Sequence, residues 1–166
     1  IARRILCYVD AGKPLARATR YDITLTGAKS SAGLSMNEPL QFRFVTVGYL
    51  EVTSTNPANG AQDIGTDSGI TLVFNRPVVP LTSIDQQKDL PQPLTFKPAV
   101  EGSGRWINTS VYSFKPNLPL LAATTYTVSV TSTLTDTTGG VLAEPFAWSF
   151  TTTNPIVQGV TPEPNV

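Results

Sequence analysis

Residues 120–130 read LLAATTYTVSV and residues 15–25 read LARATRYDITL, so the chain contains one motif twice. Tyr21 returns as Tyr126, 105 positions later, and its neighbours return at the same spacing. The matching residues are Pro14, Leu15, Ala18, Thr19 and Tyr21 in the first copy, and Pro119, Leu120, Ala123, Thr124 and Tyr126 in the second. Apolar and polar residues alternate after each tyrosine, which is typical of a strand with one buried face.

The repeat extends in both directions from this motif. The further matched segments are LCYVDAGKP (6–14) with VYSFKPNLP (111–119), EPLQFRFVT (38–46) with EPFAWSFTT (144–152), and VTSTNPANG (52–60) with VQGVTPEPN (157–165). The spacing grows to 106 in the second pair, and we assign the extra residue to the hairpin TDTTGG, compared with KSSAG. Strand, corner, hairpin, strand and linker recur in one order, which predicts a tandem array of domains.

The repeat predicts three parts of the chain. Residues 1–47 correspond to the second half of a domain, residues 48–153 to one complete domain, and residues 154–166 to a linker and the start of a further repeat. An incomplete half has apolar strand faces and open edges. We therefore expect a fragment of a multidomain protein, in which residues 1–47 are the less stable part unless they fold back on the complete domain.

The fold class follows from alternation and turns. Helical periodicity is nearly missing and 14 prolines interrupt the candidate helices. Strands of the complete domain are expected near residues 49–55, 69–75, 77–80, 93–97, 105–115, 125–133 and 146–153, the fifth being either a bent strand or a hairpin broken at Asn108. About seven strands in roughly 100 residues predict an all-β, immunoglobulin-like sandwich.

Composition excludes several function classes. Twelve Lys and Arg balance 12 Asp and Glu, so the chain has no electrostatic attraction for nucleic acid. Histidine is absent and Cys7 is the only cysteine, which removes the commonest general base and any internal disulfide. No apolar run reaches the roughly 18 residues of a membrane span. A charged fraction of only 14% suits secreted and cell-envelope β-proteins.

No motif supplies catalytic, cofactor-binding or metal-ligating residues. There is no G-x-S-x-G and no phosphate-binding glycine loop. Aspartates fall singly or in pairs in turns, at Asp63, Asp67, Asp85, Asp89 and Asp136, where turn formation explains them better than calcium ligation. Cys7 has the same parity as Val9 on an expected strand, so we interpret it as a small buried residue.

Aromatic residues are expected to be structural. Tyr21 and Tyr126 stand at the start of a strand after a Pro-Leu corner, where a tyrosine hydroxyl can bond back to the corner. Trp106, Trp148, Phe114 and Phe150 are expected in the core. The alternative is that Trp106 is exposed beside Arg105 and grips a sugar ring or another partner.

Two segments resemble known families. PANGAQDIGTDSGITLVFNRPV (57–78) resembles SbsA-type bacterial Ig-like domains, which occur in tandem in S-layer and other envelope proteins. Residues 93–130 resemble the N-terminal Ig/macroglobulin-like region of bacterial α2-macroglobulin-like proteins. The positions that match this region are Trp106, Phe114, Pro116, Leu120, Thr124, Tyr126 and Phe150. This second resemblance implies an envelope-anchored protease trap as the parent protein, whose C-x-E-Q thioester motif is absent here because Tyr-Val-Asp follows Cys7.

The leading hypothesis is a non-catalytic structural spacer or interaction module of a bacterial cell-envelope or secreted protein. Its partners would be neighbouring domains of the same polypeptide and, through the parent protein, proteases or surface glycans. The alternative is an adhesin or a carbohydrate-binding appendage of a secreted hydrolase. Exposure of Trp106, Trp148 and Tyr112 on one flat face would favour sugar binding, whereas their burial would favour the spacer.

Overall fold

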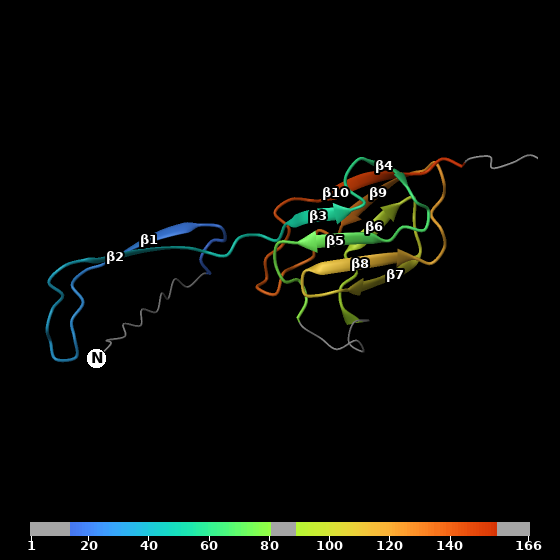
Figure 1. Ribbon diagram of the computed structural model, residues 1–166. Coiled ribbons are helices and arrows are strands. Elements are labelled where there is room, and N and C mark those ends of the chain that lie inside the picture. Colours follow the sequence, from blue (N-terminus) through green and yellow to red (C-terminus); the bar gives the residue numbers. More distant parts are fainter. Residues whose placement is uncertain (1–13, 81–88, 156–166) are drawn as a thin grey trace, which may run out of the picture. The chain divides into compact units, whose positions relative to one another are not determined.

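The computed structural model describes residues 14–80 and 89–155, in two compact units, Ile1–Tyr49 and Leu50–Val166 (Figure 1). The described residues form ten strands joined by turns and irregular loops, and none of them lies in an α-helix. The prediction of an all-β fold is confirmed. Among these residues no helix has the length and apolarity needed to cross a membrane.

The second unit contains two four-stranded sheets, which we call the sandwich. Its strands are β3 (Val52–Asn56), β4 (Ala61–Ile64), β5 (Ile70–Phe74), β6 (Leu94–Lys97), β7 (Gly102–Trp106), β8 (Val111–Pro116), β9 (Thr125–Val130) and β10 (Ala147–Thr152). One sheet has the order β4-β10-β9-β6 and the other β3-β5-β8-β7. All neighbours are antiparallel except β4 and β10, which run parallel. Figure 1 shows the two sheets as layers.

The core lies between these sheets. Alternation along β5 buries Ile70, Leu72 and Phe74, and alternation along β9 buries Tyr126 and Val128. Apolar side chains from both sheets therefore meet in one cluster, as the immunoglobulin-like prediction requires.

Three strand predictions need comment. The span 105–115 is a hairpin of β7 and β8, because the chain leaves the extended conformation at 107–110. The strand predicted at 77–80 is wrong: the backbone N–H groups of Val78 and Val79 both donate to the carbonyl of Thr109 instead of joining a ladder. β4 was missed because Asp63, at φ 55°, interrupts its alternation and shifts its register against β10.

The described part of the first unit is one antiparallel hairpin. It consists of β1 (Arg20–Leu25) and β2 (Leu40–Val45), with Tyr21 opposite Phe44 and Leu25 opposite Leu40. Asp22 and Arg43 form an exposed ion pair across the two strands. The hairpin therefore has one charged face and one face that carries apolar side chains.

Candidate functional site

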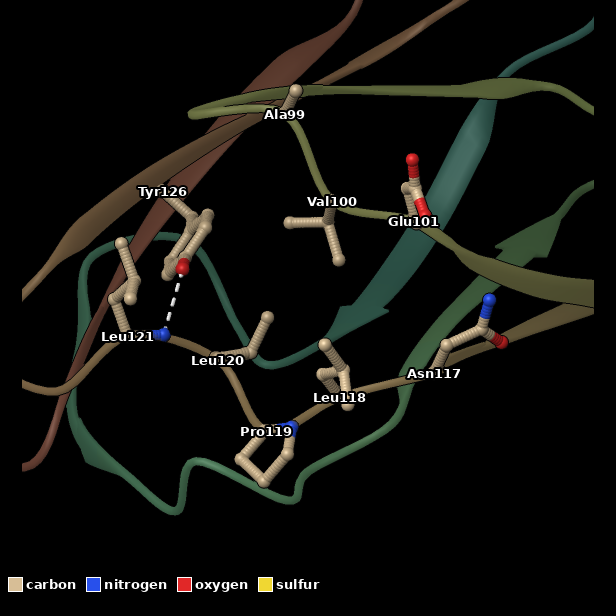
Figure 2. Close-up of a pocket in the computed structure, with 9 residues that line it drawn as sticks. All are labelled: Ala99, Val100, Glu101, Asn117, Leu118, Pro119, Leu120, Leu121 and Tyr126. Carbon is tan, nitrogen blue, oxygen red and sulfur yellow. Dashed lines mark hydrogen bonds between the residues drawn. The ribbon is translucent and has the colours of Figure 1, made fainter.

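Tyr126 braces the corner that precedes β9. Its hydroxyl accepts a hydrogen bond of 2.9 Å from the backbone N–H of Leu121, five residues earlier (Figure 2). Its ring is buried and stacks on Phe150, with centroids 5.6 Å apart. Ala123, inside the corner, has φ 50°, a conformation that costs an L-residue about 1 kcal/mol and persists only where its surroundings hold it. The tyrosine is therefore placed to hold a strained turn.

Thr152, at the end of β10, closes the same corner from the other strand. Its buried Oγ1 lies 2.6 Å from the carbonyl oxygen of Leu121 and accepts a 3.0 Å bond from the N–H of Thr124. The hydroxyl therefore ties the turn to β10. Sequence reasoning did not single out Thr152, although Thr46 occupies the same place in the first copy of the repeat.

The first unit repeats this corner atom for atom. The hydroxyl of Tyr21 accepts from the N–H of Ala16 at 3.0 Å, and its ring stacks on Phe44 at 5.5 Å. Ala18 also has φ 50°. Thr46 Oγ1 lies 2.6 Å from the carbonyl oxygen of Ala16, as Thr152 lies from that of Leu121. One sequence motif thus builds one local structure twice.

The hairpin tips also correspond, which corrects the placement of the extra residue. Gly33 and Gly139 both have φ 78°, and Ser30 Oγ accepts from Leu34 N–H as Asp136 Oδ1 accepts from Gly140 N–H. The tip KSSAGL (29–34) therefore matches the tip TDTTGG (135–140) residue for residue. The extra residue lies before the tips, which begin at Lys29 and Thr135. Four positions separate Leu25 from Lys29, whereas five separate Val130 from Thr135.

A groove of about 340 Å³ opens beside the corner of the sandwich (Figure 2). Its wall includes Val100, Leu120 and Tyr126, and Leu118 and Leu121 flank it with 78% and 64% of their surfaces exposed. Glu101 is the one charged side chain in its lining. The groove suits contact with an apolar protein surface better than it suits a charged ligand.

The structure places the predicted aromatic residues inside the sandwich. Trp106, Tyr112 and Trp148 are only 3%, 1% and 2% exposed, and Phe114 and Phe150 are also buried. The Trp106 N–H donates to the carbonyl of Pro91 at 3.0 Å. Tyr112 donates to Gln92, and burial raises the pKa of Tyr112 to about 12.

Arg105 and Trp106 do not form a joint surface. Arg105 is exposed and Trp106 is buried on adjacent positions of β7, so their side chains leave opposite faces of the strand. A sugar that stacked on the Trp106 ring would have to displace the chain around it. Among the residues that the structure describes, no three Asp, Glu, His or Cys gather to hold a metal ion. Cys7, Asp85 and the segment 156–166 lie outside the described residues.

Loss of the corner hydroxyl gives a first prediction. Tyr126→Phe keeps the buried ring but leaves the Leu121 N–H without its partner, so we expect the free energy of unfolding of the sandwich to fall by about 1–1.5 kcal/mol. Urea denaturation measures this loss. Tyr21→Phe is the matched control and should leave the transition of the sandwich unchanged. A Tyr126→Phe protein as stable as the parent would contradict the bracing role.

Comparison with known proteins gives one family. The sequence model of the family described as "Bacterial Ig-like domain" matches residues 48–152. No curated protein matches the sequence.

Among solved structures, similar chains include two mycobacterial enzymes. An L,D-transpeptidase from Mycobacterium smegmatis shares 24% identity with a TM-score of 0.42, over 63% of this chain and 40% of that chain. L,D-transpeptidase 3 from Mycobacterium tuberculosis shares 20% identity with a TM-score of 0.43, over 61% of this chain and 37% of that chain. The match spans less than half the length of each enzyme.

Proposed function

The chain belongs to the bacterial Ig-like domain family through residues 48–152, and from this premise we propose a non-catalytic structural spacer or interaction module. An Ig-like domain fits a structural or interaction role. Such domains occur in surface or extracellular proteins, so the proposed location is the bacterial cell envelope or the extracellular space. The module would belong to a larger protein, and its partners would be neighbouring domains of the same polypeptide.

The burial of Trp106, Tyr112 and Trp148 carries this proposal. Protein sites for sugars commonly present aromatic rings to solvent, and these three large rings pack against other side chains instead. Trp106 lies between Phe74 and Tyr112, with ring centroids 5.9 and 5.3 Å away. These rings belong to the buried core of the sandwich, and their burial contributes to the rigidity that a spacer requires.

The groove at the corner supports an interaction between modules. Leu118 and Leu121 are exposed where the chain leaves β10, since the N–H of Ala123 bonds to the carbonyl of Thr153. A following domain would begin near this end. As a narrower proposal, the resemblance of residues 93–130 favours an α2-macroglobulin-like protease trap as the parent protein, with proteases as the partners of the whole protein.

One observation favours the alternative, an adhesin or a carbohydrate-binding appendage of a secreted hydrolase. A hollow of about 490 Å³ lies over β7 and β8, and its lining includes the charged residues Asp67, Arg105 and Lys115. Charged and hydroxyl side chains of this kind can bind sugar hydroxyl groups. In this alternative Arg105 contributes the ligand contact, without the ring of Trp106.

Glycan binding separates the two functions. The full chain is passed over immobilised peptidoglycan, chitin and cellulose, in parallel with an Arg105→Ala variant, and tryptophan fluorescence is followed during titration with soluble oligosaccharides. We expect no saturable binding, no fluorescence change and no difference between the two proteins. Saturable binding that the Arg105→Ala change abolishes would replace the spacer with the glycan-binding function.

A further inference from the structure

The two hairpins of the chain carry the same apolar face. The equivalent inward positions are Tyr21 and Tyr126, Ile23 and Val128, Leu25 and Val130, Leu40 and Phe146, Phe42 and Trp148, and Phe44 and Phe150. All twelve residues are apolar or aromatic. The face of the β1–β2 hairpin is therefore built like the core-facing side of β9 and β10.

Burial distinguishes the two copies. Trp148 is buried at the centre of its face, whereas Phe42 at the equivalent position is 43% exposed and its neighbour Leu40 is 45% exposed. Arg20, Asp22 and Arg43 occupy the opposite face and pair with one another there. Charge is therefore on the side that a sandwich turns to solvent, and apolar area is on the side that it covers.

The sandwich shows what covers such a face. The facing sheet supplies buried side chains from β5 and β8, including Leu72 and Tyr112. The edge of β9 pairs with β6 and the edge of β10 pairs with β4. All of these strands come from residues 52–116, which precede the hairpin in sequence.

We propose that the apolar face and both edges of the β1–β2 hairpin form a docking surface for the first half of an Ig-like domain. The occupant is a polypeptide with the pattern of residues 52–116: one strand that pairs antiparallel with β1, a short strand that pairs parallel with β2, and a sheet that buries Phe42. This inference rests on the proposed function, because it treats the hairpin as half of a second module.

The two edges argue for this occupant over a second copy of the hairpin. Two hairpins stacked face to face would bury Phe42 but would leave the backbone N–H and C=O groups at the outer edges of β1 and β2 without strand partners. A half-domain satisfies the face and the edges together, as β3–β8 do for β9 and β10. The differences between the copies, such as Phe42 for Trp148, change side-chain volume without introducing a polar group.

The test supplies a first half of an Ig-like domain from this chain itself. Residues 48–118 are fused directly before Pro14, because residue 118 precedes Pro119 at the equivalent corner. Hydrogen exchange of β1 and β2 is then compared with that of the 166-residue chain. We expect amides at both edges of the hairpin to exchange at least about tenfold more slowly in the fusion, because strand pairing protects them.

A matched control carries Leu72→Asp only in the added segment, which places a charge on its inward face. This fusion should lose the protection, and the sandwich should retain its own transition. Three outcomes would overturn the proposal. The amides of β1 and β2 could be as protected in the 166-residue chain as in the fusion, or equally protected in both fusions. Protection could also appear only when the protein forms a concentration-dependent dimer. If the fusion is insoluble, the 48–118 polypeptide and its Leu72→Asp variant are each added to the 166-residue chain as separate molecules. The same difference in the protection of β1 and β2 is expected, and its absence would overturn the proposal. Glycan binding and hairpin protection are independent readouts, so failure here leaves the proposed function standing.

Discussion

Replacing Phe150 by alanine is expected to lower the free energy of unfolding of the sandwich by about 3–5 kcal/mol. Phe150 lies on β10, between β9 and β4, and only 1% of its surface is exposed. Its ring stacks on Tyr126, so truncation removes apolar contact and leaves a cavity next to the corner. Urea denaturation, followed by tryptophan fluorescence from Trp106 and Trp148, measures the loss.

Phe44→Ala is the matched control, because Phe44 holds the same position opposite Tyr21 in the first unit. We expect it to leave the unfolding midpoint of the sandwich within experimental error of the parent protein. If Phe44→Ala destabilised the sandwich as strongly as Phe150→Ala, the two units would be one cooperative structure. The assignment of the core to the second unit would then be wrong.

Gly104→Ala is expected to cost about 3 kcal/mol or more, although it adds a single methyl group. A Cβ atom at Gly104 would overlap the hydroxyl and ring of Tyr112 and the amide oxygen of Gln92. Tyr112 is buried and cannot swing into solvent without emptying part of the core. The variant should melt at lower temperature and lose near-ultraviolet circular dichroism from the Trp106–Tyr112 pair.

Gly69→Ala provides the comparison for this substitution. A Cβ atom at Gly69 would lie 3.4 Å from the carbonyl oxygen of Phe114, a close but tolerable contact. The reduced entropy of the unfolded chain offsets part of any strain, so we expect a change within about 1 kcal/mol. Equal destabilisation by both substitutions would show that loss of glycine itself, and not the overlap with Tyr112, is the cause.

Much of the sandwich could be predicted because its strands alternate strongly. Ile70, Leu72 and Phe74 are separated by polar or smaller residues, and this period of two fixes both the strand and its buried face. The same reasoning failed at 77–80, where Val78 and Val79 are both buried without forming a ladder. Two adjacent apolar residues are compatible with a buried loop as well as with a strand, so only tertiary contacts decide which of the two structures forms.

The corner could be predicted because its sequence occurs twice, but its full bonding pattern could not. Tyr126 stands out by its place after a Pro-Leu turn. Thr152 bonds to the N–H of Thr124, from which it is 28 positions away in the sequence. A threonine near a strand end carries no pattern that reveals such a partner. Exposure of Leu118 and Leu121 was equally hidden, because the sequence does not state which side of a corner faces solvent.

The order of the strands along the chain has a consequence for synthesis. Residues 52–116 leave the ribosome before β9 and β10 have been made. All strands of the sheet β3-β5-β8-β7 are therefore available while the strands that cover its apolar face are still missing. The corner of the late hairpin is closed by bonds within residues 121–153, from the five-position bond of Leu121 to Tyr126 to the 31-position bond of Thr152 to Leu121. The pairing of β10 with β4 joins residues about 90 positions apart, as in the bond from Ser149 to Asn59, and it closes the domain only after nearly all of the module has been made.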